Sequence, residues 1–554
     1  MRTNYLSSTA VSLATAVSLA TFVAVLAPAC GPAPPRVYDL CTNTGAGLPS
    51  DDRSGSCPPA PLIGAYRWDG WISGLDFDKF SDGAFSVPGF YSDTWKSREP
   101  FYGWFDGGVS GHQGIIDDEI NVAADGLLDF WAFQWSPEGP VTRNDTALAE
   151  RAKMMGPFHD YLASPFKDRL KFALIVDSVV AVLEDEVAGT LADGRHWRSQ
   201  SVPFLVAQFQ DPQYLKVNGS QPVLFWFRTS TLAASPSLRA ELQVLRDRTT
   251  AAGLGELLIV DTNTAFDDAR TVGFRGSVSY GPSGAGFFDP RESGHRCYAD
   301  QTAKDRRNWS ETIERGFVTM AGVTAGNDAR PHADEPHRYP YWVDAPTFSE
   351  WTQHLSDAIQ WLAGPASSSV ESTPSAVVTP PLAVIYSWNE LSEGGSGIVP
   401  TLQERTKFLD GVKAAKTGQL PATWEDVYNG DHCAIALVGA WARYFPVAGD
   451  AYNNDDEDTV TAGDSASLTT DQTIQFRVQG VIGPSRGAME VTIDGASQGI
   501  VDVNAPTWAS AKTLYTSPVL PAGRHTLTIV NRSTSPSAPG IGIDSIVVTK
   551  KRPY

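Results

Sequence analysis

The sequence predicts an α/β protein in which a (β/α)8 barrel is followed by an all-β sandwich. Three observations support this. Between residues 61 and 420, eight apolar segments of strand character alternate with helix-like stretches. From about residue 431 the pattern changes to short alternating strands separated by turns such as Asp494-Gly495. A length of 554 residues also exceeds what one hydrophobic core usually supports.

The eight barrel strands are expected to be rich in apolar, β-branched and aromatic residues, because strands buried on both faces require them. An open doubly wound sheet is the alternative, but no Gly-rich phosphate-binding turn follows the first strand. The expected strands are Leu62–Trp68, Leu128–Trp135, Lys171–Asp177, Pro222–Phe227, Leu257–Thr262, Gly276–Gly281, Gly316–Val323 and Ala383–Asn389.

Helices are expected where apolar residues recur at three- and four-residue spacing. Long loops at 69–112, 281–297 and 324–345 are expected on the substrate-binding face, where a barrel carries its βα loops. The expected helices are Ile115–Ala124, Thr146–Tyr161, Val179–Ala192, Leu232–Ala252, Ala265–Thr271, Ala303–Arg315, Thr347–Ala363 and Leu402–Lys416.

The C-terminal region, 431–554, is expected to be a β-sandwich, with strands that include Thr473–Val478, Met489–Ile493, His525–Val530 and Ile543–Val548. Its acidic segment Asn453–Asp458 offers carboxylates to calcium. The ligand spacing fits no standard calcium loop, so a solvated turn is the preferred interpretation.

The N-terminus predicts export. Arg2 precedes a stretch of apolar and small residues, Ser7–Leu26, which is typical of a secretory signal in residues 1–30. Ala27-Pro-Ala-Cys30 resembles a loose lipobox, so Cys30 is a candidate for lipidation and membrane attachment. Residues 31–60 are rich in Pro, Gly and Ser and are expected to be a flexible linker. The protein is therefore expected to be secreted, or a periplasmic or cell-surface lipoprotein.

The five cysteines suit an exported protein. Cys41 and Cys57 flank a stretch rich in Gly, Ser and Asp that cannot form a core, and a disulfide between them would constrain this loop. Cys297 and Cys433 either pair or remain free. Neither Cys-x-x-Cys nor His-Glu-x-x-His occurs, so a zinc site is not expected. The site residues include no metal ligands, and no cofactor is expected.

Charge and composition narrow the choice of partner. A net charge of −20 disfavours nucleic acid, because a phosphate backbone needs a basic face. Sixteen tryptophans and seventeen tyrosines suit sugar rings, which present apolar C–H patches. A carbohydrate is therefore the expected partner, and nothing implies a protein partner.

The most informative motif is a glutamate pair after the last expected strand. The run Ala383–Gly395 reads AVIYSWNELSEGG, in which Glu390 and Glu393 lie three residues apart. Two carboxylates flanking one bond are the minimum equipment for glycoside hydrolysis. On one helical turn this spacing gives about 5–6 Å between Cβ atoms, which suits a retaining enzyme. Repulsion between the two acids is expected to raise one pKa, which fits a general acid.

Polar and aromatic residues at the strand ends are candidate substrate-binding residues, because the carboxyl ends of barrel strands form the active face. Loop capping or a buried hydrogen bond is the alternative for each of them. The candidates are Tyr66, Asp69, Gln134, Trp135, Asp177, Tyr280, Asp328, Arg330, Trp388 and Asn389.

These motifs resemble a known group of enzymes. Tyr386–Gly395 is similar to the Trp-Asn-Glu-x-x-Glu-Gly signature of endo-α-mannosidase-type glycoside hydrolases and of their WbsX-like relatives. Ile63–Trp68, Asp117–Asp129 and Gly326–Pro331 resemble further motifs of the group, although Asn327 replaces an expected tryptophan. The resemblance covers about 62–415.

The resemblance implies a retaining, endo-acting glycosidase. Glu393 would act as general acid/base, and Glu390 would assist attack at the anomeric carbon by deprotonating a neighbouring sugar hydroxyl. The sandwich resembles galactose-binding-like carbohydrate modules, in which Trp441 and Trp508 would be stacking or core residues.

Two other functions remain open. One is a non-catalytic glycan-binding surface lipoprotein. The other is a WbsX-like glycosyltransferase, which would need an activated, cytoplasmic sugar, and the secretory signal argues against that source.

Overall fold

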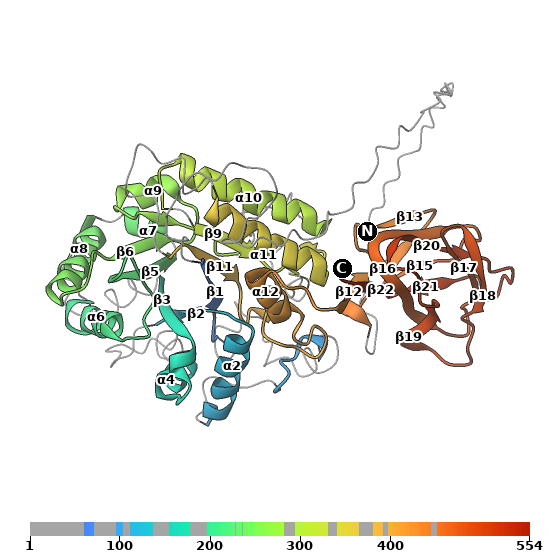
Figure 1. Ribbon diagram of the computed structural model, residues 1–554, viewed down its shortest axis with the longest axis horizontal. Coiled ribbons are helices and arrows are strands. Elements are labelled where there is room, and N and C mark those ends of the chain that lie inside the picture. The colour runs from blue at the N-terminus through green and yellow to red at the C-terminus, as the bar shows by residue number, and fades with distance from the viewer. Residues whose placement is uncertain are drawn as a thin grey trace, which may run out of the picture.

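The computed structural model describes residues 60–70, 96–103, 111–136, 154–177, 197–227, 229–234, 236–281, 294–318, 320–328, 330, 341–364, 380–391, 397–444 and 451–553. Eight parallel strands lie in the order β7-β6-β5-β3-β2-β1-β11-β9, and a parallel bridge between Gly276 and Val318 links the two ends of this order. The expected barrel is therefore confirmed (Figure 1). Its strands are β1 (Leu62–Arg67), β2 (Phe130–Trp135), β3 (Lys171–Asp177), β5 (Gln221–Phe227), β6 (Leu258–Asp261), β7 (Gly276–Ser277), β9 (Met320–Thr324) and β11 (Leu382–Tyr386).

Helices surround the parallel strands (Figure 1). They are α2 (Gln113–Asp125), α4 (Gly156–Ala163), α6 (Val202–Gln210), α7 (Thr229–Ala234), α8 (Pro236–Ala251), α9 (Phe266–Thr271), α10 (Tyr298–Glu314), α11 (Phe348–Ala363) and α12 (Lys407–Thr417). Short strands accompany them: β4 (Lys216–Val217) pairs with β5, and β8 (Gly294–Arg296) pairs with β10 (Tyr341–Val343).

Some helices differ from expectation. Helix α6 was not expected, and the helix expected at Val179–Ala192 lies outside the described residues. Helix α12 begins at Lys407 rather than Leu402, because Thr401 forms bridges with Pro100 and Arg405 instead of entering a helix. Helix α11 begins as expected, with a capping box between Thr347 and Glu350.

Alternation along the strands creates two cores. Ile63 and Ala65 face the helices, whereas Tyr66, Phe130 and Ala132 belong to the cluster inside the barrel. Gly64 also faces inward, since a Cβ there would lie 2.3 Å from the Phe130 ring. This alternation decides which strand-end side chains reach the carboxyl-terminal face of the barrel from inside.

The C-terminal region consists of antiparallel strands packed around their own apolar core, as expected of a sandwich, and it begins with β12 before residue 431. The expected strand Ile543–Val548 is divided at Asp544 into β21 and β22. The strands are β12 (Thr423–Asn429), β13 (Ile435–Val438), β14 (Ala442–Tyr444), β15 (Asp456–Thr459), β16 (Ser465–Ile482), β17 (Ala488–Ile493), β18 (Ala496–Asp502), β19 (Ala509–Thr516), β20 (Gly523–Asn531), β21 (Ile541–Ile543) and β22 (Ser545–Lys551).

The expectation of a solvated acidic turn at Asn453–Asp458 is wrong. Asp455, Asp456 and Glu457 are buried, and Asp456 begins β15. Arginines supply part of the counter-charge, because Arg443 bonds Asp455 and Arg486 lies 3.6 Å from Asp456. Burial nevertheless outweighs the nearby arginine charge and raises the pKa of Asp455 to about 8.

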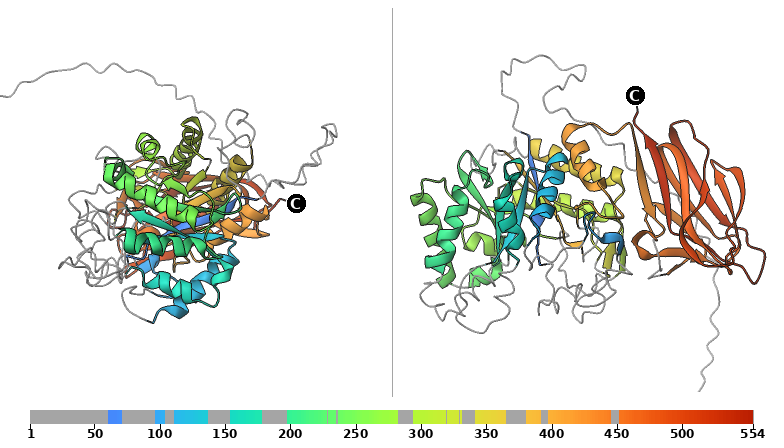
Figure 2. Two further views of the ribbon diagram at one scale, coloured as in Figure 1. Left: turned by 90° about the vertical axis from the view of Figure 1, so that its left-hand side faces the viewer. Right: turned by 90° about the horizontal axis from the view of Figure 1, so that it is seen from below.

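A disulfide between Cys297 and Cys433 joins the start of α10 to the segment between β12 and β13, across the contact between barrel and sandwich. Figure 2 shows the sandwich as a separate body beside the barrel. Of the two options for these cysteines, pairing is the one that the structure adopts. Among the described residues, no helix combines the length and the apolar character needed to cross a bilayer.

Candidate active site

Glu390 lies at the carboxyl end of the barrel, just after β11. Its side chain is almost buried, with 9% of the residue exposed, and its backbone N–H donates to Ser387 Oγ at 3.0 Å. The hydroxyl of Tyr280, which follows β7, donates a hydrogen bond to Glu390 Oε1. Two of the expected site residues therefore meet although 110 positions separate them.

Aromatic rings surround this contact from inside the barrel. The Tyr280 ring lies 4.7 Å from that of Tyr66 and 5.2 Å from those of Phe227 and Tyr386. Tyr66 is fully buried, and its hydroxyl has no hydrogen-bond partner among the described residues. Burial, with a smaller contribution from the charge of Asp261, raises the pKa of Tyr66 well above its usual value. These four rings form an aromatic floor, in which Tyr66 and Tyr386 are buried while Tyr280 and Phe227 are partly exposed. The two partly exposed rings suit sugar C–H faces.

Gln134 and Asp177 share the inward face of their strands. Gln134 is two residues beyond Ala132, and Asp177 is two residues beyond Ile175, both of which lie in the inner cluster. Asp177 is 2% exposed. The two polar side chains therefore share with Tyr66 the carboxyl end of the barrel interior.

Trp135 lies on the opposite face of β2. Its indole stacks on Phe204 of α6 with the ring centroids 5.7 Å apart, within the core between strands and helices. It is thus directed away from the barrel interior that holds Tyr66.

Asp69, Trp388 and Asn389 are buried and bonded to other protein groups. Asn389 Oδ1 accepts from the Trp68 N–H at 2.9 Å, and its Nδ2 donates to Asp69 Oδ1 at 3.1 Å. Trp388 is fully buried, and its Nε1 donates to Glu119 Oε1 at 3.2 Å. These three residues brace the loop that carries Glu390 rather than lining an open surface.

Arg67 and Glu119 are members of this arrangement that the sequence analysis did not identify. Arg67 Nη1 donates to Glu119 Oε2 at 2.5 Å, and Arg67 Nε donates to Asp69 Oδ2 at 2.9 Å. A signal was present in the sequence: Glu119 shares the apolar face of α2 with Ile116 and Ile120, where a carboxylate needs a buried partner.

Asp328 and Arg330 form an ion-pair chain toward the sandwich. Arg330 bonds both carboxylate oxygens of Asp328, at 2.7 and 2.6 Å, and its Nη1 donates to Asp455 at 2.5 Å. Arg98 also bonds Asp328. Burial by itself would raise the pKa of Asp328, but the two guanidinium groups outweigh it and lower that pKa to about 2.

Glu393 lies outside the described residues, so its distance from Glu390 remains a sequence-based expectation.

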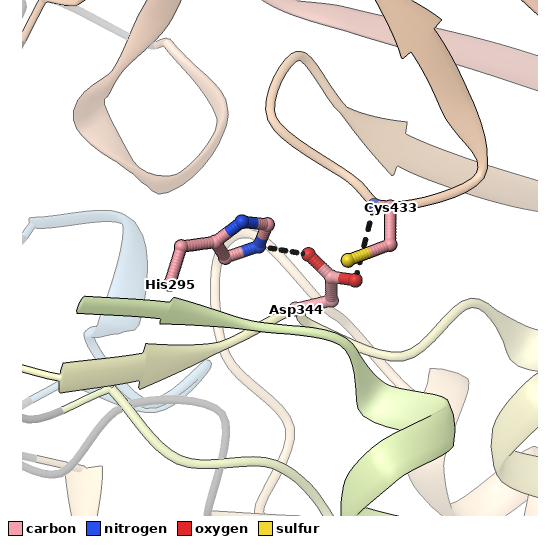
Figure 3. A group of neighbouring side chains, drawn as sticks. All are labelled: His295, Asp344 and Cys433. Atoms are coloured by element: carbon pink, nitrogen blue, oxygen red, sulfur yellow. Dashed lines mark hydrogen bonds and ion pairs between the residues drawn. The ribbon is translucent and has the colours of Figure 1, made fainter. Parts of the chain in front are cut away.

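One cluster resembles a metal site, namely His295, Asp344 and Cys433 (Figure 3). His295 Nε2 and Asp344 Oδ1 lie 2.5 Å apart, and the Cys433 N–H donates to Asp344 Oδ2 at 3.2 Å. Burial lowers the pKa of His295, but the bond to Asp344 outweighs it and gives a net increase. The sulfur of Cys433 is bonded to Cys297, so no thiolate is available as a third ligand.

Comparison with known proteins gives structural similarity only. No family model matches the chain, and no curated protein matches it. A solved structure described as a glycoside hydrolase-like protein is 13% identical with a TM-score of 0.41, covering 66% of this chain and 97% of that one. The GH99 endo-alpha-mannosidase from Bacteroides thetaiotaomicron is 12% identical with a TM-score of 0.35, covering 64% of this chain and 98% of that one.

The carbohydrate-binding module CBM36 in complex with calcium and xylotriose is similar at 11% identity and a TM-score of 0.17, covering 22% of this chain and 98% of that one. At these identities the similarities concern the fold. The order of the parallel strands in this chain shows the barrel independently of these comparisons. It is the fold that the resemblance to endo-α-mannosidase-type glycoside hydrolases implies.

Proposed function

We propose that the protein is an exported, retaining, endo-acting glycoside hydrolase that uses Glu390 and Glu393. The observation that carries the proposal is the placement of Glu390: a nearly buried carboxylate at the carboxyl end of a barrel strand, bonded to Tyr280 above an aromatic floor. A carboxylate held in this way is an oriented acceptor for a proton of the substrate.

The two glutamates have different roles in the proposed reaction. Glu393 protonates the departing glycosidic oxygen, while Glu390 accepts the proton of the neighbouring sugar hydroxyl that attacks the anomeric carbon. Water, deprotonated by Glu393, then attacks the anomeric carbon of the resulting intermediate, and the displaced sugar oxygen takes its proton back from Glu390. The two displacements together retain the configuration. The hydroxyl of Tyr280 keeps Glu390 oriented and donates to the ionised form, which is the form able to accept a proton.

The negative net charge of the chain favours neutral glycans over polyanionic ones as substrates. The chain carries a net charge of −20, which repels polyanionic glycans such as sulfated or uronic-acid-rich chains. Neutral polysaccharides or oligosaccharides that carry a free hydroxyl beside the scissile linkage are the proposed substrates.

Export is supported by the pairing of Cys297 with Cys433, because disulfides persist in oxidising compartments. The signal-like residues 1–30, including Cys30, lie outside the described residues, and attachment through a lipid on Cys30 is part of the proposal.

The test is incubation of the purified protein with a panel of α- and β-linked neutral polysaccharides. Release of oligosaccharides, followed by proton NMR of the first-formed anomer, is expected to show endo cleavage with retention. No product from any glycan, with measurable glycan binding, would indicate the non-catalytic lipoprotein. Turnover only with an activated sugar donor would indicate a transferase.

A further inference from the structure

We propose that a buried charge hub, formed by Arg67, Asp69 and Glu119, positions Glu390 for catalysis. The hub acts on Glu390 through the two residues that precede it, Trp388 and Asn389. This inference rests on the proposed function and adds positioning residues to it.

The hub has one guanidinium between two carboxylates. Arg67 Nε donates to both oxygens of Asp69, at 3.1 and 2.9 Å, and Arg67 Nη1 donates to Glu119 Oε2 at 2.5 Å. The exposed fractions of Arg67, Asp69 and Glu119 are 0%, 5% and 2%. The planar guanidinium holds its N–H groups in fixed directions, so Arg67 connects Asp69, at the end of β1, with Glu119 on α2 in a defined geometry.

Two side-chain bonds connect the hub to the catalytic loop. Glu119 Oε1 accepts the indole N–H of Trp388 at 3.2 Å, and Asp69 Oδ1 accepts the Asn389 amide at 3.1 Å. Each carboxylate of the hub therefore holds one of the two residues before Glu390.

Backbone hydrogen bonds also hold Ser387 and Trp388 in place. The Trp388 N–H donates to the Tyr66 carbonyl at 2.6 Å, which continues the pairing of β11 with β1. The returning chain adds bonds from Ile398 N to Ser387 O and from Val399 N to Trp388 O, both 2.9 Å. The backbone bonds hold the main chain at Ser387 and Trp388, whereas the hub holds the side chains of Trp388 and Asn389.

The hub lies behind the site and not in it. Arg67 follows Ile63 and Ala65 on the helix-facing side of β1, and its guanidinium lies 4.5 Å from the centroid of Trp131 and 5.4 Å from that of Phe133. Tyr102 closes the hub by donating to Glu119 Oε1 at 2.5 Å. Substrate bound over Tyr280 would lie on the other side of the strand, so the hub acts by positioning.

The small net stability of buried ion pairs also favours a positioning role for the hub. Buried ion pairs contribute little net stability, because desolvation offsets the attraction between the charges. Supporting hydrogen bonds around catalytic groups, by contrast, affect rate strongly, since small displacements of a reacting group are costly. Removing one partner leaves a buried charge unpaired and lowers stability, so each variant is first shown to be folded. In the folded variants the main effect is expected on turnover.

The test is steady-state kinetics of Glu119→Gln on the substrate found in the glycan panel. Glutamine keeps the size and an acceptor for Trp388 but removes the charge that holds Arg67. We expect kcat to fall about 10- to 100-fold with KM changed by less than about threefold. Asp69→Asn is the second variant and is expected to act in the same direction.

The matched control is Asp129→Asn at the amino-terminal end of the same strands, where Asp129 Oδ2 accepts the Ile63 N–H at 2.7 Å and Lys416 Nζ at 2.5 Å. It also removes the charge from an ion pair beside β1 and β2, and it is expected to leave kcat unchanged. A kcat at the wild-type level in folded Glu119→Gln and Asp69→Asn would overturn the proposal.

A second readout does not need a substrate. Crystal structures of the wild type and of both variants are expected to show the hydrogen bond between Tyr280 and Glu390 intact in the wild type and broken or displaced in the variants. The same bond in an unchanged position in a folded variant would overturn the positioning role. A displaced bond in a protein that cleaves no glycan would instead contradict the proposed function and leave the hub supported. If neither charge variant folds, Tyr102→Phe, which deletes only one hydroxyl from the hub, is subject to the same two criteria.

Discussion

The hydroxyl of Tyr280 donates a hydrogen bond to Glu390, joining the carboxyl ends of two barrel strands that have β9 between them. The bond places a titratable carboxylate and a donor on one side of an aromatic floor. The proposed chemistry depends on this site. The stability of the whole chain also depends on two contacts between barrel and sandwich, namely the disulfide Cys297–Cys433 and the pair Glu350–His432.

Tyr280→Phe removes one hydroxyl and keeps the ring. Because Glu390 loses the donor that orients it, kcat is expected to fall at least about tenfold while the ring still stacks on substrate. Steady-state kinetics measure this. Tyr214→Phe is the control, since it removes a buried hydroxyl that donates to the Val223 carbonyl at 2.8 Å, and its activity should equal that of the wild type. Full activity in Tyr280→Phe would remove the main support for the role of Glu390.

Glu393→Gln replaces the proposed general acid/base by an amide that neither donates nor accepts the required proton. Turnover is expected to fall about 10²- to 10⁴-fold, whereas glycan binding, measured by calorimetry, should persist. Glu311→Gln, at an exposed pair with Arg315, is the control. Equal turnover in Glu393→Gln and the wild type would exclude the glutamate-pair mechanism.

Cys297→Ser with Cys433→Ser removes the disulfide that joins α10 to the sandwich across 136 residues of sequence. The unfolded chain gains conformational freedom, so the free energy of unfolding is expected to drop by about 2–4 kcal/mol. Denaturant unfolding of the double variant, and of the wild type with and without reductant, measures this drop. Identical midpoints in all three samples would show that the disulfide does not stabilise the protein.

Alkaline pH is expected to weaken the contact between barrel and sandwich at Glu350 and His432, whose side chains approach to 3.3 Å. Burial lowers the pKa of His432, but the charge of Glu350 outweighs it and raises that pKa to about 9. Burial raises the pKa of Glu350, yet His432 outweighs it and lowers that pKa to about 2. Because the pKa of His432 is raised in the folded protein, its stabilisation is complete below the unfolded value near 6.5 and is lost as pH rises through about 9.

Unfolding measured from pH 6 to 10 should therefore show a decrease of about 1 kcal/mol or more across this window. In Glu350→Gln the decrease should become smaller, because Asp344 and Asp431 are then the remaining groups that raise the pKa of His432. Glu425→Gln, which breaks an exposed pair with Arg477, should keep it. A decrease of unchanged size in Glu350→Gln would assign the pH dependence to another group.

Much of the architecture was predictable because it depends on local patterns. Strands such as Lys171–Asp177 are continuous apolar runs, and the start of α11 is encoded in the capping box of Thr347 and Glu350. The segment Asn453–Asp458 was not predictable from its composition. Burial of Asp455 depends on Arg330 and Arg443, which neighbour it only after folding.

What the sequence by itself determined is the kind and order of the strands and helices, together with the acidic motif after the eighth barrel strand, because hydrophobic periodicity and turn chemistry act over a few residues. The tertiary structure decided which side chains meet. Tyr280 reaches Glu390, and Arg67 reaches Glu119, only because parallel strands align their carboxyl ends and alternate their faces. Those contacts link residues 110 and 52 positions apart, beyond the range of any local pattern.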